Sequence, residues 1–204
     1  MRALPERRRI GQQARRRRRW NMGRFRMGDV IIVSGSPGSG KTTIARKLAL
    51  RYARAVHLHT DDFWHAIVSG AVPPYLPESD RQNQTVVGVI AAAAFGYAAG
   101  GYTTIVDGIV GPWMLHHYRQ VSREHPDITV HYVVLRPDRR TALKRAQERT
   151  EPGVLTDEQP ILALWDQFTD LGPYSPNAID TTDLDISETV DAVHRAVTAG
   201  TYTT

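Results

Sequence analysis

A run of small residues followed by lysine and threonine has the composition of a phosphate-binding loop. Residues 35–42 read Gly-Ser-Pro-Gly-Ser-Gly-Lys-Thr and fit the pattern G-x-x-x-x-G-K-[ST]. Glycines let backbone N–H groups approach a phosphate closely, the lysine reaches the β- and γ-phosphates of a nucleotide, and the threonine hydroxyl is a ligand for Mg²⁺. The predicted nucleotide-binding residues are Gly35, Ser36, Pro37, Gly38, Ser39, Gly40, Lys41, Thr42 and Thr43.

The segments on either side of this loop are those that must position it. Residues 30–33 are Val-Ile-Ile-Val, which is typical of a buried parallel strand. After the loop, Ile44, Leu48 and Ala49 recur among basic residues with helical spacing. A helix N-terminus binds anions because its free N–H groups point at the ligand and its dipole adds about half a positive charge. The flanks therefore support nucleotide binding.

Strand and helix patterns alternate to the end of the chain and predict an α/β fold. We expect a five-stranded parallel sheet with helices on both faces. The expected strands are residues 30–33, 55–60, 102–107, 128–135 and 178–180. After the first helix, further helices are expected over residues 63–70, 80–99, 111–125, 137–149, 157–171 and 187–199, with Ser187 as the N-cap of the last.

Carboxylates follow the second and third expected strands. Ligands bind beyond the carboxyl ends of parallel strands, so these acids are expected to face the phosphate loop. Asp107 is predicted to hold Mg²⁺ with Thr42, directly or through water, or to contact the substrate. Asp61 and Asp62 both follow the second strand, and a carboxylate in that position could accept the proton of an acceptor hydroxyl. Asp61 could instead cap the next helix, which would leave Asp62 as the base.

Arginines and tryptophans supply the remaining candidates. Arg145 and Arg149 lie one turn apart on the same face of the expected helix over residues 137–149 and could offset negative charge on phosphates. A solvated basic helix is the alternative interpretation. Trp64 and Trp113 each follow a strand-end acid and could line an acceptor pocket, although packing is their more common role.

The histidines are expected to have core or surface roles. His57 and His59 alternate along the second strand, and His116 and His117 lie in a helix. No acid or cysteine stands near them at the spacing that metal sites require.

The order of these features resembles that of the nucleoside-monophosphate-kinase-like P-loop kinases. Within them, residues 29–198 look most like the group of gluconokinases, chloramphenicol phosphotransferase, zeta toxins and polynucleotide kinases. The resemblance implies a P-loop kinase architecture that uses ATP and Mg²⁺, with a short lid over the phosphates that Arg145 and Arg149 would begin. It also implies that Asp61 is the catalytic aspartate, the general base for an acceptor hydroxyl, and Asp62 is then a candidate substrate contact.

Two sub-resemblances point to different acceptors. Asp62-Phe63, followed by Ser69-Gly70 and Asp80-Arg81, is similar to the gluconokinase pattern, in which the arginine contacts a polar substrate. The phosphate loop with Asp61-Asp62-Phe63 also resembles the polynucleotide kinases.

Charge divides the chain into an N-terminal extension and one domain over residues 28–204. Residues 1–27 hold eleven arginines and one glutamate, a net charge of +10, whereas the rest carries 15 basic and 20 acidic residues, a net charge of −5. We expect the extension to be disordered. It is either a nucleic-acid or anionic-surface arm, or a non-functional extension upstream of a start at Met22 or Met27.

The composition excludes other function classes. The chain has no cysteine, so disulfides, thiolate metal sites and cysteine nucleophiles are absent. Its longest apolar region, residues 86–99, is too short for a membrane span. We expect a cytoplasmic monomer or homodimer that phosphorylates a hydroxyl of a small molecule, such as a sugar acid, an antibiotic or a nucleotide-like metabolite. The alternatives are a polynucleotide 5′-hydroxyl kinase and a non-catalytic ATP-binding regulatory module.

Overall fold

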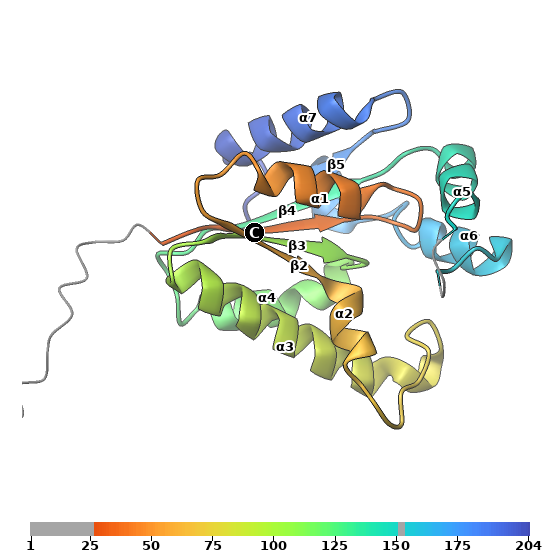
Figure 1. Ribbon diagram of the computed structural model, residues 1–204, viewed down its shortest axis with the longest axis horizontal. Helices are drawn as coiled ribbons and strands as arrows, with labels where there is room; N and C mark the ends of the chain where they lie inside the picture. Colours follow the sequence, from red (N-terminus) through yellow and green to blue (C-terminus); the bar gives the residue numbers. More distant parts are fainter. Residues whose placement is uncertain (1–26, 151–153) are drawn as a thin grey trace, which may run out of the picture.

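A parallel five-stranded sheet forms the centre of the protein (Figure 1). The structure is a computed structural model that describes residues 27–150 and 154–204. The strand order is β2-β3-β1-β4-β5, and every neighbouring pair is parallel, as the sequence predicts. All carboxyl ends therefore meet at one edge. The strands are β1 (Val30–Ser34), β2 (Ala55–His59), β3 (Thr103–Gly108), β4 (Val130–Leu135) and β5 (Ala178–Ile179).

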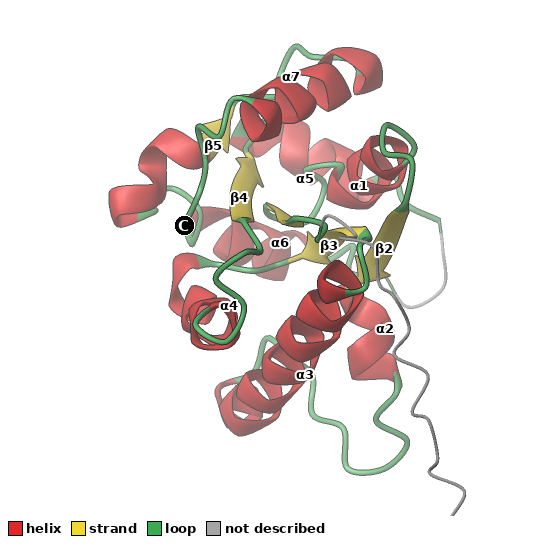
Figure 2. Ribbon diagram, turned by 90° about the vertical axis from the view of Figure 1, so that its left-hand side faces the viewer, coloured by secondary structure: helices red, strands yellow, loops and turns green. Residues whose placement is uncertain are grey.

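Helices cover both faces of this sheet. Helices α1 and α7 lie on one face and α3 and α4 on the other, while α2, α5 and α6 lie near the carboxyl ends of the strands (Figures 1 and 2). The helices are α1 (Lys41–Ala49), α2 (Thr60–His65), α3 (Asp80–Ala99), α4 (Leu115–Ser122), α5 (Arg139–Gln147), α6 (Glu158–Asp166) and α7 (Ile186–Thr198). Short 3₁₀ turns occur at Pro77–Ser79, Pro112–Met114 and Gly172–Asn177.

Strand β1 is buried on both sides, which explains the apolar sequence of its first four residues. Val30 and Ile32 pack into the core under α3 and α4, whereas Ile31 and Val33 pack into the core under α1 and α7. Alternate side chains of a strand point to opposite faces, so a strand between two helical layers needs apolar side chains on both. The last residue, Ser34, is polar and buried, and its hydroxyl donates to the carbonyl oxygen of Val110. This burial fixes the strand that leads into the phosphate loop.

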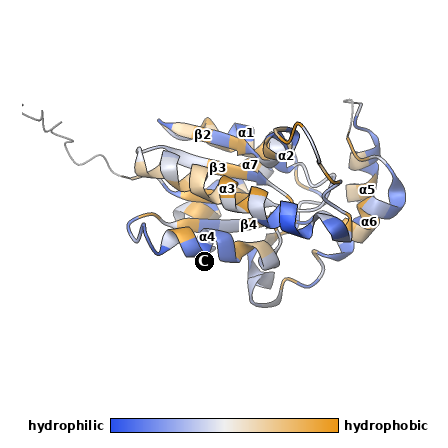
Figure 3. Cartoon of the chain, turned by 90° about the horizontal axis from the view of Figure 1, so that it is seen from below, coloured by the Kyte–Doolittle hydropathy of each residue, from blue (hydrophilic) through white to orange (hydrophobic). Residues whose placement is uncertain are grey.

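Helix α3 is the longer of the two helices, α3 and α4, that cover one face of the sheet. Its buried face includes Ala91, Ala94 and Ala98, whose small side chains allow the helix to approach the sheet closely. Most of α3 is coloured as hydrophobic where it runs along the sheet (Figure 3). Within the described residues, no helix combines the length and apolar composition needed to cross a membrane.

Some element boundaries differ from those expected. The helix predicted over residues 63–70 instead spans Thr60–His65, so residues 66–70 are not helical and Asp61 and Asp62 fall in its first turn, where the helix dipole favours carboxylates. The segment expected to be helical over residues 111–125 starts with a 3₁₀ turn. Residues 1–26, which make up nearly all of the extension expected to be disordered, lie outside the described residues.

The predicted N-cap of α7 is wrong. Asp185, two residues before Ser187, accepts a hydrogen bond from the backbone N–H of Glu188 at 2.8 Å. The Glu188 side chain in turn accepts from the backbone N–H of Asp185 at 2.9 Å, which completes a capping box. Asp185 is the better cap because the reciprocal bonds satisfy two free N–H groups at once.

We expect Asp185→Ala to lower the free energy of unfolding by about 1 kcal/mol, because it removes one N-cap hydrogen bond. Ser187→Ala is the matched control and should change it by less than about 0.5 kcal/mol, since Ser187 is exposed. Urea unfolding monitored by circular dichroism measures both. Equal losses for the two variants would contradict the capping assignment.

Candidate active site

The phosphate loop has the backbone that its glycines predict. Gly35, Gly38 and Gly40 all have positive φ values, of 147°, 77° and 83°. Helix α1 begins immediately after them, so its N-terminus points into the loop. A Cβ atom on Gly38 would collide with the carbonyl oxygen of Ala142, which shows that α5 lies directly against the loop.

Lys41 lies at the centre of a group of charges. Its Nζ donates to the carbonyl oxygen of Ser36 at 3.3 Å. Burial lowers the pKa of Lys41, the nearby carboxylates of Asp107 and Asp61 act to raise it, and the charge of Arg149 acts to lower it. The structure therefore brings these four predicted site residues, from four different segments, into one electrostatic environment.

Thr42 and Asp107 form the closest contact between the phosphate loop and the third strand. The Thr42 hydroxyl donates to Oδ2 of Asp107 at 2.6 Å. Asp107 is fully buried at the carboxyl end of β3 and faces α1. Its carboxylate fixes the orientation of the hydroxyl that the motif assigns to Mg²⁺.

Two histidines that were expected to have no functional role complete the surroundings of Asp107. His57 Nε2 lies 2.5 Å from Oδ1 of Asp107, and His59 Nδ1 lies 3.1 Å from Oδ1 and 3.2 Å from Oδ2. Strand register explains the contacts, because His57 pairs with Ile105 and His59 with Asp107 on neighbouring parallel strands. Their i, i+2 spacing in the sequence could have indicated this arrangement, because it places both rings on the same face of the strand.

These donors control the charge of the carboxylate. Burial acts to raise the pKa of Asp107, but hydrogen bonds from His57, His59 and Thr42 outweigh it and hold the pKa well below its usual range. The hydrogen bond to Asp107 in turn raises the pKa of His59 above 6.5, against an opposing effect of burial. The structure therefore favours an ionised carboxylate at the end of β3.

The oxygen-rich pair of Thr42 and Asp107 fits Mg²⁺. This ion prefers oxygen ligands and takes one or two from the protein, with the rest from water and substrate phosphates. Among the described residues, no group of three or more His, Cys, Asp or Glu side chains is arranged to hold a metal by itself.

Asp61 and Asp62 are exposed in the first turn of α2, beside this cluster. Oδ2 of Asp61 lies 3.5 Å from His59 Nε2. The carboxylate of Asp62 lies close enough to His59 to contribute to the raised pKa of that ring. Neither aspartate side chain accepts a capping hydrogen bond at the start of α2. The capping role that was the alternative for Asp61 is therefore not observed.

The two predicted lid arginines point to different places. Arg149 follows the end of α5, and its buried Nε has no hydrogen-bond partner among the described residues. Its charge affects Lys41, which agrees with a place over the phosphates. Arg145 instead donates to the carbonyl oxygens of Thr181 and Thr182, each at 3.4 Å. Residues 151–153 of the predicted lid lie outside the described residues.

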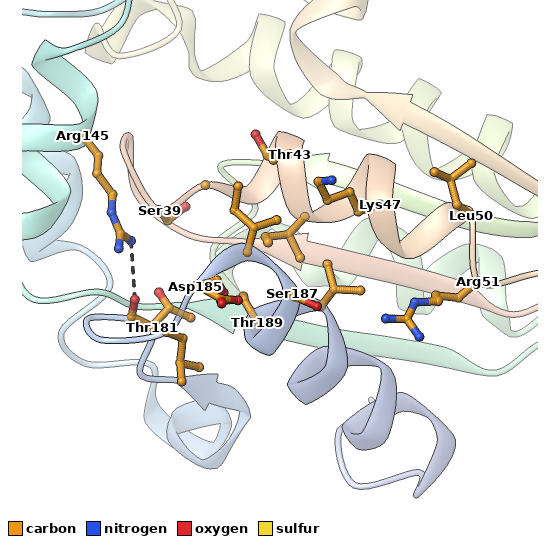
Figure 4. A pocket seen from close by; sticks show the side chains of 15 residues that line it. Ser39, Thr43, Lys47, Leu50, Arg51, Arg145, Thr181, Asp185, Ser187 and Thr189 are labelled. Carbon is orange, nitrogen blue, oxygen red and sulfur yellow. Dashed lines mark hydrogen bonds between the residues drawn. The ribbon is translucent and has the colours of Figure 1, made fainter.

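Arg145 borders a cavity of about 950 Å³ beside the phosphate loop. Gly40 and Thr43 form one side of it, and Thr181 and the start of α7 form the other (Figure 4). The buried Thr181 hydroxyl has no partner among the described residues. The volume lies within the range of small-molecule sites, about 300–1,000 Å³.

The predicted acceptor contacts lie around the opposite side of the site. Trp64 is half-buried, and its Nε1 donates to Asn83 Oδ1 at 2.9 Å, which joins α2 to α3. Arg81 is exposed and borders a groove between the same two helices. Trp113 is 45% exposed and covers Gly111 in the turn after β3. Acceptor roles for these three residues stay predictions.

A protein-family model described as an AAA domain matches residues 30–171, which is more than half of the chain. The chain belongs to this family of P-loop proteins. A search of the curated proteins returns no match.

Several solved structures similar to this AAA domain are named as kinases, and they match the nucleoside-monophosphate-kinase-like group. A gluconokinase from Sinorhizobium meliloti 1021 has 17% identity and a TM-score of 0.60, over 85% of this chain and 94% of that one. A shikimate kinase from Acinetobacter baumannii has 18% identity and a TM-score of 0.60, over 86% and 96%. A sugar kinase from Janibacter sp. HTCC2649 has 23% identity and a TM-score of 0.58, over 84% of this chain and 93% of that one. These likenesses show a shared P-loop kinase fold.

Two glycines of the AAA domain should respond differently to alanine. Gly40→Ala should cost about 1–2 kcal/mol of stability from its positive φ alone, because nothing lies within 4 Å of the added methyl group. Gly38→Ala combines a positive φ with a collision at Ala142, so we expect a loss larger by at least about 1 kcal/mol. Urea unfolding measures the free energy of unfolding of both variants. Equal losses would contradict this prediction, because they would mean that α5 moves away from the added methyl group at no cost.

The pKa shifts predict how stability depends on pH. The pKa of His59 is raised above 6.5, so its contribution is complete below about pH 6.5 and is lost as the pH rises through the folded-state value. The pKa of Asp107 is lowered from 3.8, so its contribution exists above about pH 3.8 and is lost in stronger acid. Together they stabilise the AAA domain most between these two limits.

His59→Ala should therefore lower the free energy of unfolding by about 1 kcal/mol or more near pH 5.5, and by less near pH 9. His65→Ala, at an exposed position of α2, is the control and should show a small change at both pH values. A His59→Ala effect that grows with pH would contradict the direction of the shift.

Proposed function

We propose that this chain is an ATP- and Mg²⁺-dependent kinase that transfers the γ-phosphate to a hydroxyl of a small molecule. The observation that carries this proposal is the convergence of Lys41, the Thr42–Asp107 pair, Asp61 and Arg149 at one end of the sheet. Phosphoryl transfer requires positioning and neutralisation of charge more than covalent chemistry, and this set supplies both. Structural neighbours named for gluconate, shikimate and sugar support a small-molecule acceptor.

ATP would occupy two connected parts of the site. The phosphate loop would hold its phosphates through backbone N–H groups and Lys41. The cavity bordered by Thr43, Arg145 and Thr181 is placed to receive the nucleoside. The orphaned Thr181 hydroxyl supports this use, because a buried polar group without a partner is costly unless a ligand satisfies it. In this arrangement Arg145 acts on the nucleoside side and not over the phosphates.

Magnesium would be held by the Thr42 hydroxyl together with nucleotide oxygens, with Asp107 acting directly or through water. When bound, the ion would neutralise charge that develops on the transferred group. Thr42 donates its proton to Asp107, so its oxygen lone pairs remain available to a cation. The bonds from His57 and His59 keep Asp107 ionised for this purpose.

Transfer would proceed with Asp61 as the general base. Its exposed carboxylate would accept the proton of the acceptor hydroxyl while the hydroxyl oxygen attacks the γ-phosphorus and ADP leaves. Lys41 and Arg149 would stabilise the charge on the phosphoryl group. Asp62, Arg81, Trp64 and Trp113 would contact the acceptor from α2, α3 and the turn after β3.

An ATP-consumption screen of the full chain tests this function. Pools of sugar acids, antibiotics, nucleosides and 5′-hydroxyl oligonucleotides serve as acceptors, and Lys41→Ala provides the blank. We expect one small-molecule pool to be phosphorylated. A hit among the oligonucleotides alone would move the assignment to a polynucleotide kinase. Tight ATP binding without turnover in any pool would favour a regulatory module.

Asp61→Asn should then lower kcat for the identified acceptor by about 10²–10⁴-fold without loss of ATP affinity, because general-base help is lost. Asp62→Asn is the matched control from the same helical turn and should cost less than about tenfold. A reversed pattern would assign the base to Asp62.

A further inference from the structure

The ring of His59 lies between two carboxylates that have different roles in the proposed reaction. Its Nδ1 contacts both oxygens of Asp107, at 3.1 and 3.2 Å, and its Nε2 lies 3.5 Å from Oδ2 of Asp61. An imidazole is rigid and planar, so the position of one nitrogen determines the position of the other. One side chain thus connects the residue expected at the metal with the residue expected at the acceptor hydroxyl.

Asp107 provides a fixed end for this connection. It is fully buried, and its oxygens are engaged by Thr42, His57 and His59. A buried carboxylate held by several donors has little freedom to rotate, because each rotation would leave a donor unpaired. His59 is itself held on β2, whose register places it directly opposite Asp107.

Asp61, in contrast, has few other constraints. Its side chain is 66% exposed, and it does not cap the helix in which it lies. An exposed aspartate samples several rotamers, and only some of them would point at an acceptor beside the γ-phosphate. The contact with His59 favours rotamers in which the Asp61 carboxylate lies toward Lys41. The charge of Asp61 acts to raise the pKa of Lys41.

His57 differs from its neighbour in one respect. It contacts Asp107 through Nε2, and its ring centroid lies 6.3 Å from that of His59. His57 therefore provides an internal comparison on the same strand, at the same carboxylate, without the second contact to Asp61.

We propose that His59 is a positioning residue that holds the Asp61 carboxylate at a set distance from the Thr42–Asp107 pair. This inference rests on the proposed kinase function and deepens it. His57 contacts Asp107, whereas His59 contacts both Asp107 and Asp61 and so holds the proposed base at a set distance from Asp107. Displacement of a reacting group by about 1 Å can cost about 10²-fold in rate, which gives such positioning a measurable value.

A double-mutant cycle tests the connection. His59→Asn keeps a short-range donor near the position of Nδ1, so Asp107 remains held, but it loses the reach to Asp61. The full chain is compared with His59→Asn, Asp61→Asn and the double variant, after circular dichroism confirms folding. Turnover is measured with Mg²⁺·ATP, with water and with any acceptor found in the pooled screen. The affinity for Mg²⁺·ATP is measured by calorimetry.

We expect His59→Asn to lower kcat by about tenfold or more, while KM for ATP changes by about threefold at most. In the Asp61→Asn background it should lower kcat no further, because the group that it positions is already inactive. His57→Gln, which keeps a donor near Nε2, should combine additively with Asp61→Asn. Equal effects of His59→Asn in both backgrounds, or an unchanged kcat, would overturn the proposal.

The affinity measurement separates this inference from the kinase assignment. If His59 holds the charge of Asp61 near Lys41 and the phosphates, Asp61→Asn should improve Mg²⁺·ATP affinity about threefold more when His59 is present than in the His59→Asn background. This difference in affinity can be measured even if no acceptor is turned over. Absence of turnover would count against the kinase function but not against the positioning role of His59. Equal improvement in both backgrounds would overturn the positioning role and leave the kinase function intact.

Discussion

The buried carboxylate of Asp107 is the constraint around which the site is built. An ionised carboxylate removed from water costs several kcal/mol unless hydrogen bonds replace its hydration. Here the replacement comes from Thr42 at the start of α1 and from two histidines on β2. The phosphate loop, the second strand and the third strand must therefore keep their mutual positions for the charge to remain buried.

The two sides of the site are secured by different means. On the nucleotide side, α5 packs on Gly38 so closely that no side chain fits between them. On the acceptor side, Ser34 exchanges hydrogen bonds with the backbone of Val110 at 2.7 and 3.0 Å, and the Tyr132 hydroxyl donates to the Val110 carbonyl at 2.8 Å. These buried bonds fix the turn that carries Trp113, although the tryptophan itself remains partly exposed.

A second anchor on the acceptor side joins α2, α3 and the loop between them. Asn83 accepts from Trp64 and donates to the carbonyl of Pro74 and the hydroxyl of Ser79. Gln82 makes two further bonds, to the backbone N–H and carbonyl of Val72. The amide side chains of α3 thus hold a proline-rich loop that has little regular structure of its own, on the side where we propose that the acceptor binds.

The sequence by itself determined the fold class and the nucleotide-binding end of the site. The phosphate loop can be recognised from the sequence because consecutive residues supply its strand, glycines, lysine and helix. The burial of both faces of β1 can be predicted from its run of apolar residues. Only the tertiary structure decided that His57 and His59 surround Asp107 and that Arg145 bonds to the backbone of Thr181 and Thr182. The physical reason is that these contacts join residues far apart in the sequence, and the register of neighbouring strands brings His57 and His59 to Asp107.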